Sequence, residues 1–358
     1  MASELPRLLD ANLNRASEGL RVLEDVARFV ANDGPLSREL RSMRHALADL
    51  ARTVDIGLLS ARDSVSDVGR ESGLRVGGER DLLSVVRANA KRVEESLRVI
   101  EELARLSDSG MTLDAATAER LRYACYDLEK RLSGRVVRVE RSARVDGLYV
   151  VVDRQAAGDR SLVDLAEKAI AGGASVIQLR DKTGERGQVY REAVELSTVC
   201  RERDAVFIMN DYCDIAVAVG ATGLHIGQQD MPLEAVRRVM PIDAIVGVSC
   251  ENADHVRRAV SEGADYIAVG AIFSTLQKAD HVLAGLDVLR ESRELAGSIP
   301  LVAIGGINLE NVTAVVEAGA DSVAVIGAVI LQPDVRLAAV RMVEAIQRAK
   351  ERRQNAEE

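Results

Sequence analysis

The sequence has no tryptophan, and aromatic residues make up only 3% of its 358 residues. Acidic residues outnumber basic ones, 56 against 47, which gives a formal net charge of −9. Nucleic-acid binding favours a basic surface and aromatic side chains for stacking, so this composition argues against a nucleic-acid partner. The chain also lacks the roughly 20 consecutive apolar residues of a membrane span, and its N-terminal segment has no apolar signal core.

Cysteine is scarce as well: the four residues, at positions 125, 200, 213 and 250, form no C-x-x-C pair. This spacing argues against a disulfide framework or a zinc site and favours reduced thiols, so we predict a cytoplasmic protein. With 47% apolar and 29% charged residues, the composition is that of a globular protein. At about 150 residues per domain, the length predicts two domains, or one barrel with an addition.

The first part of the chain has helical periodicity and an internal repeat. The segment DANLNRASEGLRVLEDVAR (10–28) matches RANAKRVEESLRVIEELAR (87–105) at an offset of 77 residues. Two weaker helical patterns follow at 40–54 and 121–132. We therefore predict an all-α domain over 1–134, built from one helix pair used twice.

Asn, Arg, Glu, Arg and Glu recur every three residues in both copies, at 12–24 and at 89–101. This stripe is either a salt-bridged face in solvent or a polar cleft between the related helices. The segment 61–81 is rich in Ser, Asp, Gly and Arg, and it is either a phosphate-binding loop or a connector. Four arginines (135, 138, 141 and 144) mark 135–146 as a linker, for which a solvated connector is favoured over a phosphate contact.

From residue 147 onward, eight β-branched runs alternate with amphipathic helical patterns. Alternating strands and helices imply parallel βαβ units, and eight of them predict a (β/α)₈ TIM barrel over 147–350. The alternative, a doubly wound sheet, lacks a G-x-G-x-x-G turn after its first strand. The expected strands are Leu148–Val152, Ser175–Leu179, Ala205–Met209, Gly223–His225, Ala244–Val248, Tyr266–Val269, Pro300–Ile304 and Ser322–Ile326.

Polar residues gather where these strands end, and the C-terminal strand ends form the catalytic face of such barrels. Arg180, Lys182 and Lys278 are suited to binding an anion, while Asp211 and Asp230 are oxygen ligands of the kind that Mg²⁺ prefers. Cationic side chains beside a carboxylate pair that can bind Mg²⁺ suggest that the ligand is a diphosphate. The glycine-containing steps 305–306 and 326–327 offer backbone N–H groups to a second phosphate. Each feature has a structural alternative: a tight turn at 305–306, helix caps at Asp211 and Ser249, and a core histidine at His225.

The motifs QLRDK, NDYCDIAVAVGATGLHIGQQD, GVS, GADYIAVGAIFSTLQK and AIGGIN, in this order, resemble those of the thiamine-phosphate synthase family, over about 147–345. The resemblance implies joining of hydroxymethylpyrimidine diphosphate to hydroxyethylthiazole phosphate with release of diphosphate, and one Mg²⁺ per barrel. It implies catalytic roles for Arg180, Lys182, Ser249 and Lys278, metal binding by Asp211 and Asp230, and substrate binding by Gln178, Leu179, Asp181, Asn210, His225, Thr275, Leu276, Gln277, Gly306, Ile326 and Gly327.

Four positions depart from the family pattern. Ala271 and Ser274 stand where proline is usual, and Gln277 and Gly327 replace hydroxyl residues on the thiazole-phosphate side. We therefore expect these changes to weaken or alter binding of the thiazole phosphate, the acceptor, sooner than they impair departure of diphosphate from the pyrimidine. A related barrel, the thiazole tautomerase, is the alternative, with the helices as a non-catalytic dimerisation or regulatory module. The complete metal and diphosphate set favours the synthase.

The helical part resembles the single-function hydroxymethylpyrimidine-phosphate kinase domain that precedes such synthases, through RDSVSDVG and the two AN-x-x-R helices. The resemblance implies ATP as a co-substrate, although the segment contains no Walker A motif. The expected partners are small-molecule substrates, with neither nucleic acid nor membrane. The sequence leaves the oligomeric state open and allows a homo-oligomer.

Overall fold

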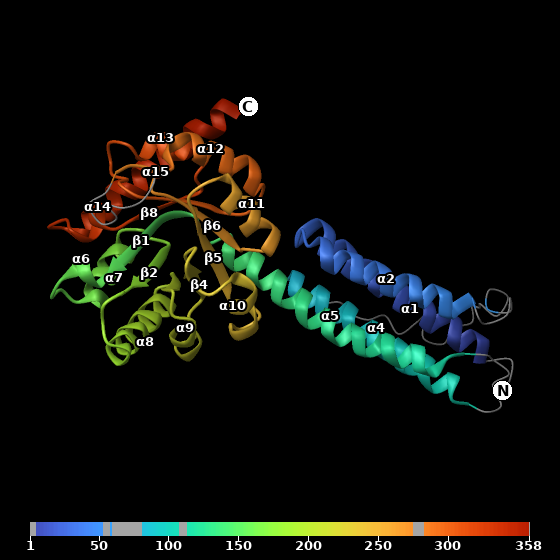
Figure 1. The fold of residues 1–358 in the computed structure, drawn as a ribbon. Coiled ribbons are helices and arrows are strands. Elements are labelled where there is room, and N and C mark those ends of the chain that lie inside the picture. Colours follow the sequence, from blue (N-terminus) through green and yellow to red (C-terminus); the bar gives the residue numbers. More distant parts are fainter. Residues whose placement is uncertain (1–4, 53–57, 59–80, 107–112, 275–282, 358) are drawn as a thin grey trace. The chain divides into compact units, whose positions relative to one another are not determined.

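The computed structural model describes residues 5–52, 58, 81–106, 113–274 and 283–357 (Figure 1). The chain forms two compact units, residues 1–137 and 138–358. The first is helical and the second is a barrel, as predicted. Among the described residues, no helix is both long and apolar enough to cross a membrane.

The helical unit confirms the predicted repeat. Its helices are α1 (Leu5–Asp25), α2 (Gly34–Arg52), α4 (Leu82–Ala104) and α5 (Ala115–Ser142), and α1 continues into the π-turn η1 (Val26–Val30). Helix α1 packs along both α2 and α4, and one buried cluster takes residues from all four helices. Gly19 allows α1 to approach α4 closely, because a Cβ atom there would lie 2.7 Å from Val93 Cγ2.

The predicted polar stripe divides in the structure into buried ends and an exposed middle. Asn12 and Glu24 are buried, and so are their equivalents Asn89 and Glu101. The arginines and glutamates between them are exposed in both copies. Each Asn side chain donates to the backbone carbonyl four residues earlier on its own helix. The stripe is therefore neither entirely a solvent face nor a continuous cleft.

The barrel unit contains eight parallel strands that close in sequence order, β1 beside β8, among the described residues. All eight predicted strands are confirmed. Helical segments separate the parallel strands along the chain, as βαβ units require. The strands are β1 (Gly147–Asp153), β2 (Val176–Arg180), β3 (Val206–Asn210), β4 (Gly223–Ile226), β5 (Ile245–Cys250), β6 (Tyr266–Val269), β7 (Leu301–Ile304) and β8 (Ser322–Val325).

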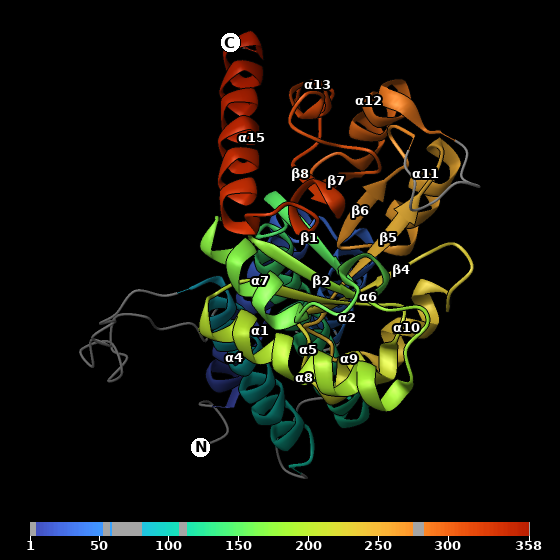
Figure 2. The ribbon, with the colours of Figure 1, turned by 90° about the vertical axis from the view of Figure 1, so that its left-hand side faces the viewer.

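Helices surround the strands (Figures 1 and 2), and the long α15 packs against α7, α13 and β1. They are α6 (Arg154–Ala157), α7 (Leu162–Ala171), α8 (Arg186–Glu202), α9 (Cys213–Ala218), α10 (Leu233–Val239), α11 (Ala253–Glu262), α12 (Gly285–Ala296), α13 (Val312–Glu317), α14 (Gly327–Ile330) and α15 (Val335–Glu357).

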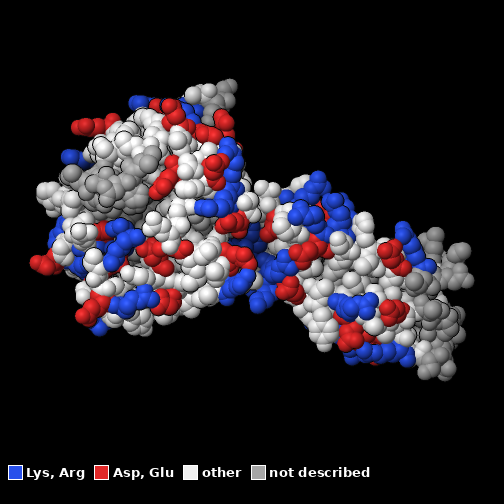
Figure 3. Space-filling view, viewed as in Figure 1, with Lys and Arg blue, Asp and Glu red and all other residues white. Residues whose placement is uncertain are grey.

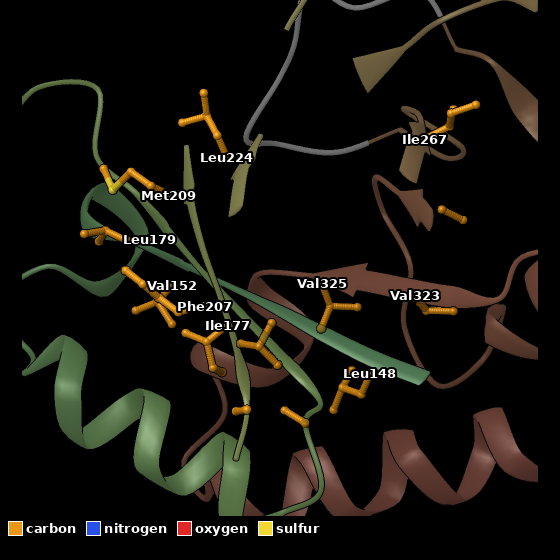
Figure 4. Packing of buried hydrophobic residues seen from close by; sticks show 14 of the residues in the cluster. Leu148, Val152, Ile177, Leu179, Phe207, Met209, Leu224, Ile267, Val323 and Val325 are labelled. Carbon is orange, nitrogen blue, oxygen red and sulfur yellow. The ribbon is translucent and has the colours of Figure 1, made fainter. Parts of the chain in front are cut away.

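Strand pleating divides the barrel core into two layers. One set of side chains packs between strands and helices, and Leu148, Ile177, Leu179 and Phe207 belong to it (Figure 4). The alternate positions fill the barrel interior, where Tyr149 and Tyr266 are among the largest fully buried side chains. Because successive residues of a strand face opposite sides, this parity decides which strand residues can reach the barrel mouth.

The predicted linker at 135–146 is helical as far as Ser142, so α5 continues into it. Arg138 and Arg237 both form ion pairs with the buried Asp265. Arg141 and Arg144 each bind a backbone carbonyl and a carboxylate, at Asp243 and Asp204 respectively. Instead of extending into solvent, three of the four arginines of this segment therefore attach it to the barrel unit.

Candidate functional site

The carboxyl ends of the barrel strands surround a cavity of about 290 Å³. It meets the expectation for such barrels, since the site lies where the βα loops begin. The residues around it come mainly from β5 to β8 and from the loops that follow them, with one residue from β2. They are Arg180, Ser249, Glu251, Ala268, Gly270, Ala271, Ile304–Asn308, Ala324–Ala328 and Gln332.

One side of the cavity is made of backbone. Gly305 and Gly306 have positive φ angles of 106° and 64°, which favour glycine. A Cβ atom on Gly306 would lie 2.6 Å from the Ser274 carbonyl oxygen, so a side chain is excluded there. The predicted residues Gly306, Ile326 and Gly327 all line this side of the cavity. Close backbone of this kind can present N–H groups to a phosphate.

Arg180 lines the same cavity from the end of β2, and its partner is Asp153 at the end of β1. The two residues are paired across neighbouring strands in the sheet register. The Asp153 carboxylate also accepts the Ala156 backbone N–H, which fixes it at the start of α6. The ion pair holds the guanidinium at the mouth, where its remaining N–H groups can bind an anion.

The two predicted metal ligands are brought together. Asp211 follows β3 and Asp230 follows β4, and their side chains lie within hydrogen-bonding reach of each other. The Asp211 backbone adopts a φ of 62°, and its N–H donates to the His225 carbonyl. Burial and the neighbouring Asp230 carboxylate raise the pKa of Asp211, although the Lys182 ammonium, 3.3 Å away, partly offsets this rise.

Two adjacent carboxylates need a shared proton or a cation between them, because their like charges repel. The donor set therefore fits Mg²⁺, which typically takes one or two protein carboxylates and completes its shell with phosphate and water. Among the described residues, no group of three or more His, Cys, Asp or Glu side chains could hold a metal ion. The protein share of such a site would thus be the Asp211–Asp230 pair.

A chain of hydrogen bonds crosses the barrel interior from β2 to β5. Gln178 Nε2 donates to the Tyr149 hydroxyl at 2.8 Å, and that oxygen lies 3.2 Å from the Tyr266 hydroxyl. The Tyr266 hydroxyl is 3.0 Å from His225 Nδ1, and His225 Nε2 is 2.8 Å from Ser249 Oγ. We call these five residues the interior chain. His225 is thus a fully hydrogen-bonded histidine whose ring also stacks on Tyr266.

The amide of Gln178 sets the direction of this chain. Because the amide nitrogen only donates, the Tyr149 hydroxyl accepts there and passes its own proton to Tyr266. Tyr266 then donates to His225 Nδ1, so the imidazole proton sits on Nε2 and is donated to Ser249 Oγ. The Ser249 hydroxyl proton is left for a ligand, and Ser249 lines the cavity. Burial raises the pKa of both tyrosines, so their hydroxyls keep their protons.

The other predicted residues lie in several different places. Asn210 is buried at the end of β3, beside His225 in the register. Asp181 accepts the Thr183 and Gly184 backbone N–H groups, which makes it a loop anchor. The Leu179 side chain packs between strands and helices, so it points away from the mouth. Thr275, Leu276, Gln277 and Lys278, like the segment 61–80, lie outside the described residues.

Sequence reasoning missed Tyr149, Tyr266 and Asp153. A tyrosine within a strand is indistinguishable from ordinary core, and these two are 117 positions apart. The alternation of strand residues was an available signal, because it places both tyrosines, like Gln178, on the faces of their strands that point into the barrel. Asp153 stands at the end of the first strand, and that position was the signal that could have identified it.

A closed (β/α)₈ barrel with a glycine-lined cavity, an ion-paired arginine and a carboxylate pair at the carboxyl ends of its strands has the features of a TIM-barrel enzyme. The chain belongs to the thiamine monophosphate synthase family, whose model matches residues 148–329. It is 40% identical over 334 residues to the thiamine-phosphate synthase of Thermosynechococcus vestitus, covering 92% of each chain. It is 36% identical to that of Rhodopirellula baltica, over 96% of this chain and 92% of the other.

A solved structure agrees with the barrel. The thiamine phosphate pyrophosphorylase of Pyrococcus furiosus superposes with a TM-score of 0.54 and is 35% identical, covering 59% of this chain and 98% of that one. The helical unit matches a second model, that of the ThiD2 family, over residues 7–131. The curated relatives are matched over both units, so the pairing of the two is shared with them.

Proposed function

We propose that the barrel joins hydroxymethylpyrimidine diphosphate to hydroxyethylthiazole phosphate, as a thiamine-phosphate synthase. The observation that carries this proposal is the pairing of a site for Mg²⁺ and diphosphate with a second anion site at one mouth, within a chain of this family. One is the Asp211–Asp230 pair with Lys182, and the other is the glycine cradle at 305–306. The transferase has a donor and an acceptor that each carry phosphate, so it needs both.

In the reaction, the bond between the pyrimidine methylene carbon and the diphosphate oxygen breaks, and both electrons leave with the diphosphate. The thiazole nitrogen then forms a bond to that carbon with its lone pair. Arg180 and Lys182, with Lys278 from the sequence motif, would stabilise the charge that develops on the diphosphate. When bound by Asp211 and Asp230, Mg²⁺ would supply Lewis-acid stabilisation of the same oxygens. The reaction uses no protein nucleophile.

The interior chain gives Ser249 a defined role in this proposal. Its hydroxyl accepts from His225 Nε2 and so presents its proton to the cavity. A fixed donor at the mouth can orient a substrate without reorganisation during the reaction. We therefore treat Ser249 as a substrate-contacting donor and the two tyrosines as positioning residues.

The test is the formation of thiamine phosphate by the full chain, compared with the Asp211→Asn variant. We expect the variant to lose roughly 100-fold or more of kcat/KM, because a metal ion supplies several kcal/mol of charge stabilisation. The matched control is Asp214→Asn, which removes an exposed carboxylate nearby on α9. A thiazole tautomerase would need neither pyrimidine diphosphate nor the metal pair, so isomerase activity that survives in Asp211→Asn would favour that alternative.

For the helical unit we propose phosphorylation of hydroxymethylpyrimidine phosphate with ATP. The match of residues 7–131 to the ThiD2 family supports this second function. The product would be the diphosphate that the barrel consumes. Cytoplasmic location and homo-oligomer formation stay predictions from the sequence.

A further inference from the structure

The two copies of the helix pair can be compared position by position. Their first helices are offset by 77 residues, from Leu5 to Leu82, and their second helices by 81, from Gly34 to Ala115. Asp33 and Asp114 begin the second helices in the same way, each accepting a first-turn backbone N–H at 3.0 Å. One copy therefore serves as a reference for the other.

A buried ion pair is also repeated. Glu24 accepts from Arg41 Nε at 2.9 Å, and its equivalent Glu101 accepts from Arg122 Nε at 3.0 Å. Burial alone would raise the pKa of Glu24, but the hydrogen bonds and charges of Arg41 and Arg44 outweigh it and lower the pKa. The pairing of this glutamate with an arginine of the second helix is therefore the same in both copies.

The copies differ in charge at the turn beside this pair. In the second copy, Arg105 bonds Glu101 at 2.6 Å and lies 3.7 Å from Glu119. In the first copy, the equivalent of Arg105 is Arg28, and the equivalent of Glu119 is Arg38. Within the described part of the chain, neither Arg28 nor Arg38 has a carboxylate within ion-pair distance; Arg28 instead contacts the Phe29 ring. The first copy thus has two positive charges at the positions where the second copy has one positive and one negative charge close together.

These two arginines border a pocket of about 280 Å³, which we call the Arg28 pocket. It is lined by Arg28, Asn32, Gly34, Ser37, Arg38 and Arg41. Arg38 folds back over the first turn of α2, since a Cβ atom on Gly34 would lie 3.3 Å from its Nη1. Figure 3 shows Lys and Arg side chains gathered over the turn between α1 and α2.

Ser37 adds a hydroxyl to the lining of the pocket. The residue is 7% exposed, and it lines the pocket together with Arg28 and Arg38. The second copy has Ala118 at this position. The serine therefore occurs only in the copy that also keeps the unpaired charge.

We propose that the Arg28 pocket binds a phosphate group. Arg28 and Arg38 would contact its oxygens, the Ser37 hydroxyl would donate to it, and the positive end of the α2 dipole would add to the attraction. Ligand pockets commonly measure about 300–1,000 Å³, so this one suits a phosphate with part of its ester group. The site does not depend on the kinase proposal, because phosphate binding needs no transfer to ATP or from it.

The test is hydrogen exchange of the full chain, measured by mass spectrometry with millimolar inorganic phosphate. We expect phosphate to slow exchange in the peptides that cover residues 28–41. This readout separates the Arg28 pocket from the phosphate sites of the barrel. Hydroxymethylpyrimidine phosphate and ATP form two further arms, and the ligand that protects at the lowest concentration identifies the source of the phosphate.

Two variants test whether the Arg28 pocket binds the phosphate. Each replaces a pocket residue by the residue at the equivalent position of the second copy. Arg38→Glu should weaken phosphate binding roughly tenfold or more, and Ser37→Ala should weaken it less. The matched control is Arg52→Glu, an exposed charge reversal at the other end of α2, which should bind like wild type. Circular dichroism checks that each variant keeps its helices. The proposal is overturned if phosphate gives no protection in wild type, or if protection is undiminished in both pocket variants.

Discussion

Single residues with defined proton positions carry the chemistry of the barrel mouth. The interior chain matters because each hydroxyl has only one proton to donate. The Gln178 amide at one end therefore determines that Ser249, at the other end, can donate its proton to a ligand. Gly247 makes room for the interior chain: a Cβ atom there would lie 1.9 Å from Tyr266 Cζ. The four cysteines, in contrast, are buried and form no disulfide, and burial raises the pKa of the Cys200 and Cys250 thiols to about 12.

Tyr266→Phe should lower kcat for thiamine phosphate formation about fivefold, because it removes the hydrogen bond to His225, worth about 1 kcal/mol, through which the interior chain orients Ser249. The decisive measurement is a double-mutant cycle with Ser249→Ala. If Tyr266 acts through Ser249, the second substitution should add nothing in the Ser249→Ala background.

Tyr190→Phe, on the exposed surface of α8, is the matched control and should behave like wild type. Additive losses in the Tyr266→Phe/Ser249→Ala cycle would mean that Tyr266 only supports the core. The interior chain would then have no positioning role.

At the scale of elements, the contact between α4 and α5 brings the buried Glu94 close to the partly buried Glu129. Glu94 is 4% exposed, and its Oε1 atom has no hydrogen-bond partner within the described ranges. Burial, then the charge and hydrogen bond of Glu129, raise the pKa of Glu94 from 4.5 to about 7. Lys91, 3.9 Å away, counteracts this only in part.

The folded protein therefore keeps a proton on Glu94 that the unfolded chain releases above pH 4.5. Its stabilising effect is complete at lower pH and is lost as pH rises towards about 7, so the free energy of unfolding should fall over this range. Glu94→Gln should remove this fall and be more stable than wild type at pH 8. Thermal unfolding of the full chain, followed by circular dichroism at several pH values, measures it.

The neighbouring exposed Glu95 provides the control, and Glu95→Gln should keep the wild-type slope. Equal slopes in wild type and Glu94→Gln would show that Glu94 is ionised in the fold throughout.

The elements were largely predictable from the sequence. Each strand was placed to within about a residue at most ends, because short apolar runs between helical patterns are a local signal, and a Gly-Ala step precedes four of them. The repeat was visible because residue identities recur at a fixed offset. The burial of Glu24 and Glu101 could not be predicted in this way, because their partners Arg41 and Arg122 lie on other helices. The interior chain joins residues of five strands, and no local pattern encodes such a contact.

At the scale of the whole molecule, the two units would catalyse consecutive steps. We expect the full chain to form thiamine phosphate from hydroxymethylpyrimidine phosphate, ATP, Mg²⁺ and hydroxyethylthiazole phosphate. The Asp211→Asn variant, which is altered only in the barrel, should still consume ATP when hydroxymethylpyrimidine phosphate is present. A coupled ADP assay beside product chromatography separates the two steps. ATP consumption that does not depend on the pyrimidine would rule out the kinase.

The repeated helix pair has one more consequence. Two copies that pack together through their first helices amount to a homodimer whose subunits are tethered in one polypeptide. In a true homodimer every substitution appears twice, so both halves must keep the same charge at each position. The tether removes that symmetry, and Arg38 and Glu119 now hold opposite charges at equivalent places. A tandem repeat in one chain lets one half specialise in recognition while the other retains the scaffold.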